Sequence, residues 1–281
     1  MGDDESNILR LYRVGCREPE QAFDLNNHLA PEIAYPEADI EGACRVANRS
    51  YWITSHGRNR NGELRRSRYR FFAVDLWIAP HCLRLTTVGV PYTRLVNDLS
   101  AAPHLAHYNF RELQYRPPKS ADALAIEGLA PAPDGDALLI GFRNPVPNCR
   151  ALVIPLLNPD QLLSGDAGAQ FGEPIELDLG GRGVREIDYV PQLQSYLIVA
   201  GAIDARRQFA VFRWSGAAAD APRPYAHTAF GALSPEALIA FPGRRDVLLL
   251  SDDGTRRIGE QVGKEVASAR QRGFRTIWFT P

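Results

Sequence analysis

The chain has 281 residues, of which 45% are hydrophobic and 23% are charged, as is ordinary for a soluble globular protein. A formal net charge of −1 and the lack of any apolar run of ~18 residues lead us to expect no nucleic acid and no membrane as partner. The four cysteines contain no C-x-x-C pair and the N-terminus does not resemble a secretory signal, which indicates a cytoplasmic protein with reduced thiols.

One sequence template recurs four times along the chain. Each copy has an acidic residue, a short apolar strand, a turn, a strongly apolar strand and a polar or glycine-rich corner, in that order. The copies span residues 39–58, 125–144, 186–204 and 234–254. Further strand-like runs, such as YRFFAVDL and RALVIPLL, follow the corners. Short strands that repeat in this way predict an all-β protein, specifically a β-propeller with blades of four antiparallel strands.

The number of blades depends on two further stretches. Residues 2–5 and the strand ILRLYRV parallel residues 251–254 and the strand after them, which gives a fifth, partial copy without its inner strands. The interval from Glu41 to Glu127 is long enough for a sixth copy, but we favour a short helical insertion over residues 92–118. We therefore predict one domain, residues 1–281, with five blades and an incomplete first blade. Six blades and a β-sandwich are the alternatives.

The repeat places its polar residues at one mouth of the central channel. The first strand of a propeller blade lines the channel and the second runs antiparallel to it, so the start of the first and the end of the second share a face. The acids aligned at the strand starts are Glu41, Glu127, Asp188 and Glu236. The residues expected beside them are His56, Arg58, Arg143, Asn144, Asp204, Asp252 and Asp253, with Arg182 and Arg185 nearby.

Four carboxylates at a narrow opening need compensation, because neighbouring like charges raise each other's pKa. A hard cation such as Ca²⁺ is one solution, since it takes several carboxylate oxygens. Arginines interleaved with the acids are a second. In the third, the acids accept hydrogen bonds from backbone N–H groups of neighbouring blades. The four acids are therefore candidate ligands of Ca²⁺ or another divalent cation, and equally candidate structural residues.

Two functions fit such a mouth. In the first, a bound cation polarises an ester oxygen and activates water, with His56, Arg58 and Arg143 as catalytic residues of a metal-supported hydrolase of an anionic ester, such as a phosphoester. In the second, the mouth binds a ligand or a protein without catalysis. In both, the partner is a small anionic ligand or a protein. The residues expected to bind such a ligand are Asn144, Arg182, Arg185, Asp204, Asp252 and Asp253.

Several uncommon strings occur in order along the chain: ADIEGA, YWITSHGRNRNGELR, AIEGLAP, LLIGFRNPVP, LDLGGRGVREIDYVP, YLIVAG, and PEALI followed by LLLSDDG. Through these strings, which are spread over nearly the whole chain, the sequence resembles an uncharacterised bacterial family, domain of unknown function 3616. The resemblance implies a propeller-like fold and brings no established activity. A weaker, fold-level likeness links the strand starts to phytase-like esterases and to calcium-dependent propeller nucleotidases.

The start of the chain departs from that family, whose members carry a further β segment before the stretch that matches residues 2–5. The resemblance implies either that this start is too late or that the first blade is incomplete. We expect a poorly covered strand edge between the first and last blades, through which two copies pair as an edge-mediated dimer. The cytoplasmic assignment holds for the sequence as written and depends on what precedes Met1.

Overall fold

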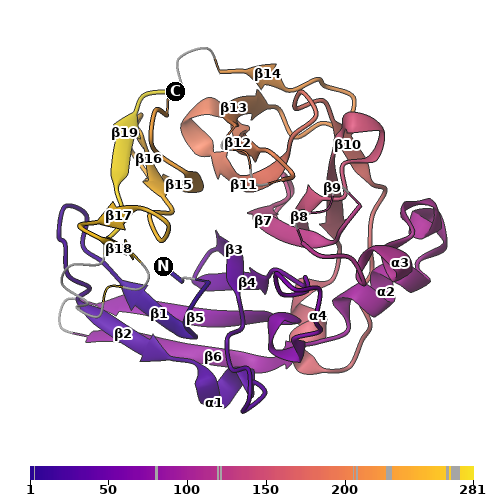
Figure 1. Ribbon diagram of the computed structural model, residues 1–281, viewed down its shortest axis with the longest axis horizontal. Coiled ribbons are helices and arrows are strands. Elements are labelled where there is room, and N and C mark those ends of the chain that lie inside the picture. The colour runs from indigo at the N-terminus through magenta and orange to yellow at the C-terminus, as the bar shows by residue number, and fades with distance from the viewer. Residues whose placement is uncertain are drawn as a thin grey trace.

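The protein consists mainly of β-strands arranged as a propeller. Its structure is a computed structural model, and it describes every residue except 3, 80–81, 119, 121, 205, 207, 226–229, 264–265 and 267–272. Figure 1 shows the blades arranged around a common centre, with one strand of each blade innermost. The predicted all-β propeller is confirmed, but the described residues form four blades rather than five or six.

The four blades follow one another along the chain, and neighbouring strands within each are antiparallel. Blade 1 contains β3 (Ile40–Val46), β4 (Arg49–Thr54), β5 (Phe71–Ala79) and β6 (Cys82–Tyr92). Blade 2 contains β7 (Ala125–Pro131), β8 (Leu138–Asn144), β9 (Ala151–Leu156) and β10 (Ile175–Leu177). Blade 3 contains β11 (Gly183–Val190), β12 (Ser195–Gly201), β13 (Phe209–Trp214) and β14 (Arg223–Pro224). Blade 4 contains β15 (Pro235–Ala240), β16 (Val247–Ser251) and β19 (Thr276–Phe279).

The other elements are short. Two hairpins lie outside the blades: β1 (Ile8–Leu11) with β2 (Gln21–Asp24), and β17 (Arg257–Ile258) with β18 (Gln261–Val262). The α-helices are α1 (Asn26–Leu29), α2 (Leu95–Ala101), α3 (Phe110–Leu113) and α4 (Pro159–Ser164). The 3₁₀ helices are η1 (Arg66–Arg68), η2 (Pro103–Tyr108), η3 (Pro147–Cys149) and η4 (Pro191–Leu193). In the described part of the chain, no helix has the length and hydrophobicity that spanning a membrane requires.

The β1–β2 hairpin is the stretch that we expected to form a fifth, incomplete blade. Its Leu9 and the adjoining Leu25 pack instead against Phe72 and Val74 of β5, so the hairpin buries its apolar face on blade 1. The same apolar pattern suits a hairpin that covers an existing blade and one that starts a new blade, which is why the sequence did not separate the two. Asp3, within the stretch that suggested the extra copy, lies outside the described residues.

The hydrophobic core lies between neighbouring blades. One cluster joins blades 1 and 2 with α2 and α3, a second joins blades 2 and 3, and a third joins blades 3 and 4. A middle strand therefore packs on both faces, and all seven residues of β12 are buried. This explains why the second strand of each template copy is a continuous apolar run rather than an alternating one.

The inner strands approach one another so closely that two positions exclude any side chain. A Cβ atom at Gly42 would lie 2.9 Å from the carbonyl oxygen of Glu127, and one at Gly128 would lie 2.8 Å from Cγ1 of Val184. Each glycine follows a glutamate that is central to the channel mouth. The Glu-Gly pairs of the first two copies thus combine a charged side chain with a close contact between blades.

Candidate functional site

Each inner strand contains a β-bulge near its start, where one residue has no partner on the second strand. The register shifts between Ile40 and Gly42, between Ile126 and Gly128, between Val184 and Glu186, and between Pro235 and Ala237. The residues within these shifts are Glu41, Glu127, Arg185 and Glu236. Because a bulge turns a side chain away from the ordinary alternation of a strand, it directs one charged residue of each blade to a common position.

The bulges correct the sequence alignment of the third copy. The residue in register with Glu41, Glu127 and Glu236 is Arg185, and the aligned Asp188 lies three residues farther along β11. The four bulged residues are therefore three acids and one base, not four acids.

Arg185 connects the bulges of blades 2, 3 and 4. Its Nε lies 2.9 Å from Oε2 of Glu127, its Nη1 donates to Oε1 of Glu127 at 3.1 Å, and its Nη2 pairs with Glu236. Arg143, at the end of β8, donates from Nη1 to the same Oε1 at 3.0 Å. The side chains of Arg185 and Glu127 are only 10% and 6% exposed. Two of the three glutamates are thus compensated by interleaved arginines in a setting where charge pairs are weakly screened.

Glu41 is the exception among the bulged residues. Its carboxylate has no hydrogen bond or ion pair with the described residues, although the side chain is only partly exposed. Burial and the nearby Glu127 and Asp39 raise the pKa of Glu41 well above its ordinary value, against the opposing charge of Arg185. Burial also raises the pKa of Asp39 to about 7, even though Arg68 pairs with it at 2.8 Å. The blade 1 side of the mouth therefore carries an uncompensated carboxyl group.

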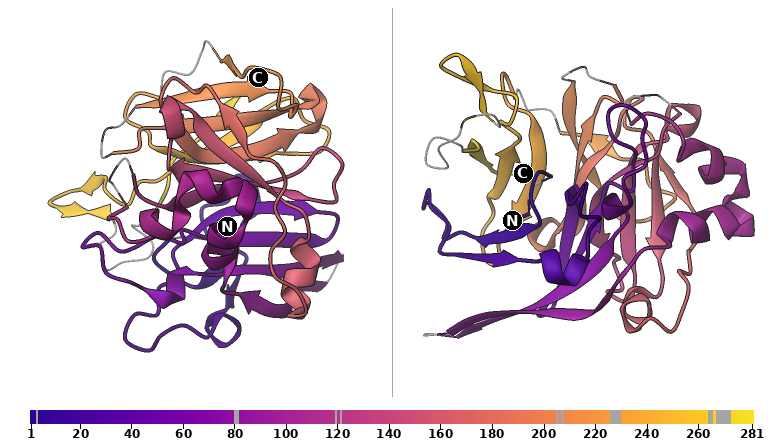
Figure 2. Two further views of the ribbon diagram at one scale, coloured as in Figure 1. Left: turned by 90° about the vertical axis from the view of Figure 1, so that its right-hand side faces the viewer. Right: turned by 60° about the horizontal axis from the view of Figure 1, so that its bottom comes forward.

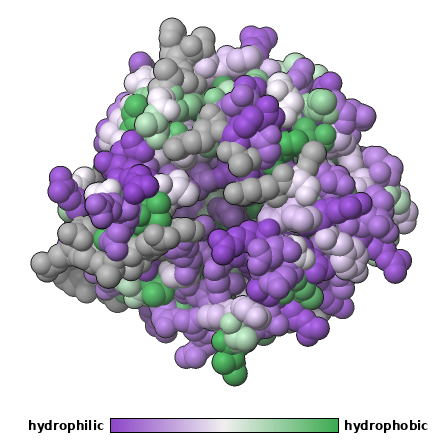
Figure 3. Space-filling view, in the orientation of Figure 1, coloured by the Kyte–Doolittle hydropathy of each residue, from purple (hydrophilic) through white to green (hydrophobic). Residues whose placement is uncertain are grey.

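The hydropathy of the surface agrees with this description. Figure 3 shows a hollow at the centre of the face seen in Figure 1, and the residues that line it are hydrophilic.

Asp188 points toward blade 4 and not into the group around Arg185. Its Oδ2 accepts a hydrogen bond from the backbone N–H of Ala240 at 3.2 Å, so it contacts the backbone of the neighbouring blade as in the third predicted arrangement. Burial raises the pKa of Asp188 to about 7.

Glu186 is a buried acid that the sequence analysis did not single out. It lies two residues before Asp188 and therefore on the same face of β11. It is 5% exposed, and Oε1 accepts from the N–H of Ile187 at 3.1 Å. Burial, followed by the charge of Asp188, raises the pKa of Glu186 well above its ordinary value. The alternation of acids at positions 186 and 188 was the signal that could have revealed it.

The predicted catalytic residues of the first corner do not meet the group around Arg185. His56 is fully buried, its Nδ1 lies 2.8 Å from the carbonyl oxygen of Thr54, and burial lowers its pKa to about 4. Arg58 donates from Nε to the carbonyl oxygen of Gln114 at 2.8 Å, with its guanidinium over the ring of Tyr115. These contacts organise the corner, and of the three predicted catalytic residues Arg143 alone contacts a bulged glutamate.

Asn144 and Arg182 contact loop backbone. Asn144 is fully buried and donates from Nδ2 to the carbonyl oxygen of Ser120 at 2.6 Å. Arg182 donates from Nη1 to the carbonyl oxygen of Leu179 at 3.3 Å.

The three predicted aspartates have local partners. The Asp204 carboxylate pairs with Arg206, while its backbone carbonyl accepts from Nη2 of Arg143 at 3.1 Å. Asp252 accepts from the N–H of Gly254 in a turn at 2.7 Å. Asp253 is buried and pairs with Arg275 at 2.7 Å.

The described residues do not assemble the predicted calcium site. Nowhere in that part of the chain do three His, Cys, Asp or Glu side chains lie close enough together to hold a metal ion. Of the four predicted ligands, Glu127 and Glu236 pair with arginine and Asp188 accepts backbone N–H groups. Glu41 is the predicted ligand whose carboxylate has no hydrogen bond or ion pair with the described residues.

Comparison with known proteins gives a family and no activity. The model of a family described as a protein of unknown function (DUF3616) matches residues 82–246. No curated protein sequence matches, and the likeness to phytase-like esterases and propeller nucleotidases is not confirmed.

Two similar solved structures are enzymes of much greater length. Dihydro-haem d1 dehydrogenase NirN is 13% identical, with a TM-score of 0.34 over 90% of this chain and 39% of that one. The hydrazine synthase of Kuenenia stuttgartiensis is 8% identical, with a TM-score of 0.31 over 85% of this chain and 61% of that one. This chain thus spans less than two thirds of either protein.

Proposed function

The chain belongs to the DUF3616 family of proteins of unknown function, and from the geometry of its mouth we propose that it is a non-catalytic binding propeller that takes up a cationic group. The ligand class is an amine or a guanidinium, carried by a small molecule or by a protein. This replaces the small anionic ligand expected from the sequence.

The observation that supports this proposal is the charge balance among the bulged residues. Arg185 and Arg143 compensate Glu127 and Glu236, and among the described residues Glu41 pairs with no cation of its own. A cationic group near Glu41 would restore the balance and favour the ionised carboxylate. Arg185 shows that a guanidinium suits two bulged glutamates, and the Glu236 side chain is 35% exposed.

The same contacts argue against an anionic ligand. Arg185, which we expected to bind it, is already paired with Glu127, and Arg182 is directed to the carbonyl oxygen of Leu179. Of the two arginines expected to act in catalysis, Arg143 is also paired with Glu127, and Arg58 is directed to Gln114 and Tyr115.

Metal-supported hydrolysis of an anionic ester is the second candidate. It is favoured by Asp39, whose pKa of about 7 suits a general acid or base near neutral pH, beside the free carboxyl of Glu41. Ca²⁺ or another divalent cation would then occupy the place that we assign to an amine or guanidinium.

Thermal unfolding with a panel of ligands separates the two functions. A ligand that binds only the native state raises the free energy of unfolding by RT ln(1 + [L]/Kd), and the melting temperature rises with it. We expect N-acetyl-arginine amide to raise it in the wild type and in Glu173→Gln, which removes an exposed acid outside the mouth, and not in Glu41→Gln. Ca²⁺, Mg²⁺ and inorganic phosphate complete the panel, followed by an ester and phosphoester screen. Divalent-dependent ester hydrolysis that Glu41→Gln abolishes would overturn the non-catalytic function.

A further inference from the structure

Positive charge is concentrated in one loop between β4 and β5. Residues 57–68, which we call the arginine loop, contain five arginines and one glutamate, whereas the whole chain has a net charge of −1. Arg65 and Arg68 pair with acids of the loop and of the preceding segment. The arginines of the loop that form no ion pair with any described residue are Arg58, Arg60 and Arg66. The described part of the chain therefore leaves much of the charge of the loop uncompensated.

Both ends of the arginine loop are fixed to other segments. Near its end, Ser67 accepts a hydrogen bond on Oγ from the N–H of Glu32 at 2.8 Å and donates to the carbonyl oxygen of Tyr35 at 2.7 Å. Near its start, Arg58 donates to the carbonyl oxygen of Gln114, which directly follows α3. Figure 2 shows the magenta helices α2 and α3 at the outside of the propeller. A loop held in this way loses little conformational freedom when it binds a partner.

Exposed apolar side chains gather at the Tyr35 end of the arginine loop. The guanidinium of Arg65 lies over the ring of Tyr35, with Cζ 3.6 Å from the ring centroid, and the tyrosine is 48% exposed. Leu64, next to Arg65, is 42% exposed, and Ile33, two residues before Tyr35, is 100% exposed. Tyrosine and arginine are enriched at the centres of protein interfaces, and here they lie beside aliphatic side chains in solvent.

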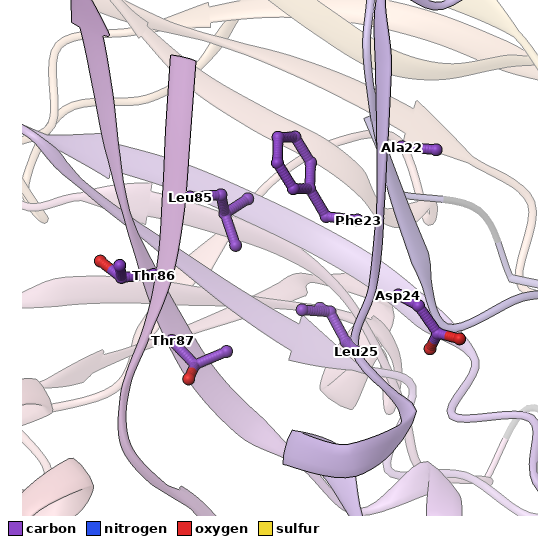
Figure 4. A pocket seen from close by; sticks show the side chains of 7 residues that line it. All are labelled: Ala22, Phe23, Asp24, Leu25, Leu85, Thr86 and Thr87. Carbon is purple, nitrogen blue, oxygen red and sulfur yellow. The ribbon is translucent and has the colours of Figure 1, made fainter. Parts of the chain in front are cut away.

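The groove between the β1–β2 hairpin and β6 has a different charge. It is lined by residues 22–25 and 85–87, which include no arginine or lysine. The charged residue among them is Asp24, labelled in Figure 4. An acidic group would be repelled there, whereas the arginine loop attracts it.

We propose that the arginine loop, together with residues 32–35, binds an acidic segment of a partner protein in which carboxylates flank an apolar side chain. The carboxylates pair with Arg60 and Arg66, whose guanidinium groups can each donate two hydrogen bonds to one carboxylate. The apolar side chain of the partner packs on Ile33 and Leu64. This surface is separate from the cation site of the mouth and binds the opposite charge.

The charge of the chain favours a short acidic segment over a long polyanion. Outside residues 57–68 the acids outnumber the bases, so a nucleic acid strand that continued past the loop would meet net negative charge. The aliphatic side chains of Ile33 and Leu64 also lack the planar face on which a base stacks. They do fit an aliphatic or aromatic side chain of a protein. A protein segment with carboxylates on both sides of one apolar residue matches the charge and the apolar contacts together.

Fluorescence anisotropy with a labelled peptide that repeats two glutamates and a leucine tests the proposal. The wild type should bind it, and Arg60→Gln combined with Arg66→Gln should weaken binding about ten-fold, because two exposed ion pairs are lost. Leu64→Ser should weaken binding as well. These side chains are exposed, so the variants should keep the wild-type melting temperature. The matched control is Arg223→Gln, an exposed arginine of β14 in blade 3, and Glu41→Gln tests independence from the mouth. Both should bind the peptide as the wild type does.

Two further probes separate the chemistry of the partner. A peptide with serine in place of leucine, and an oligothymidylate with the same number of charges, should each bind more weakly than the leucine peptide. Failure of the wild type to bind the leucine peptide would overturn the proposal, as would unchanged binding by the double arginine variant or equal loss in Arg223→Gln. Equal binding of the serine peptide would refute the apolar contact. Tighter binding of the oligothymidylate would assign the surface to nucleic acid instead.

Discussion

Arg185 occupies the position that a glutamate occupies in the other three blades. The bulge at this position interrupts the alternation of β11, so the residue that faces the mouth is not the one that simple periodicity selects. Asp188 is aligned with the glutamates because the apolar residues after it continue the flanking pattern of the other copies, although Glu186 lies nearer to the bulge. The substitution of one arginine among three acids explains how Glu127 and Glu236 are compensated within the mouth.

The buried acids make stability depend on pH in an unusual direction. In the folded protein burial raises the pKa of Asp188 from 3.8 to about 7. Between these values the unfolded chain has released the proton and the folded chain has kept it, so the free energy of unfolding falls as pH rises. This contribution is complete below the unfolded pKa and is lost as pH passes through about 7.

Asp188→Asn should therefore flatten the dependence of melting temperature on pH. Asparagine keeps an oxygen that can accept the N–H of Ala240 but has no proton to lose. Asp39, whose pKa is also about 7, remains, so the slope should decrease without vanishing. Melting curves between about pH 4 and about pH 8 provide the measurement. A variant slope equal to that of the wild type, or of the control Glu173→Gln, would contradict this explanation.

At the scale of the strands, contact between blades depends on the absence of side chains at the bulge glycines. A Cβ atom at Gly128 would lie 2.8 Å from Cγ1 of Val184 and 3.0 Å from Cγ2 of Ile187. Gly128→Ala should lower the free energy of unfolding by about 1–3 kcal/mol, the usual cost of overpacking. Denaturant unfolding measures it, with Gly273→Ala as the control, because a Cβ there meets no atom of the described residues within 4 Å. Equal stability of the two variants would show that blades 2 and 3 have room to separate.

The strands themselves could be predicted, and their register could not. Each template copy gave an inner strand and a second strand close to their observed bounds, because apolar runs between turn residues determine both. The corner residues were assigned to the mouth from topology alone. His56 is instead buried and its Nδ1 contacts the carbonyl oxygen of Thr54 at the end of its own strand. Asn144 is buried with its Nδ2 on the carbonyl oxygen of Ser120, a contact between separate segments of the chain that no local pattern encodes.

For the whole molecule, the predicted number of blades depended on whether the first hairpin forms a blade of its own. The similarity of residues 2–5 to residues 251–254 is real at the level of composition, but β1–β2 packs on the face of blade 1 and adds no inner strand at the channel. Four inner strands therefore define the mouth. Their four bulges place one arginine among three glutamates, and in the described part of the chain Glu41 is the glutamate that pairs with no cation.

The binding of a cation at Glu41 should release protons. Because burial raises the pKa of Glu41, the carboxyl binds a proton more readily than an ordinary glutamate, and a cationic group beside it lowers that pKa again. Titration calorimetry of N-acetyl-arginine amide in buffers of different ionisation enthalpy, at a pH near neutrality, measures the protons released on binding. We predict release by the wild type and none by Glu41→Gln. Binding without proton release, or the same release from both proteins, would contradict the claim that an uncompensated Glu41 is the ligand site of this propeller.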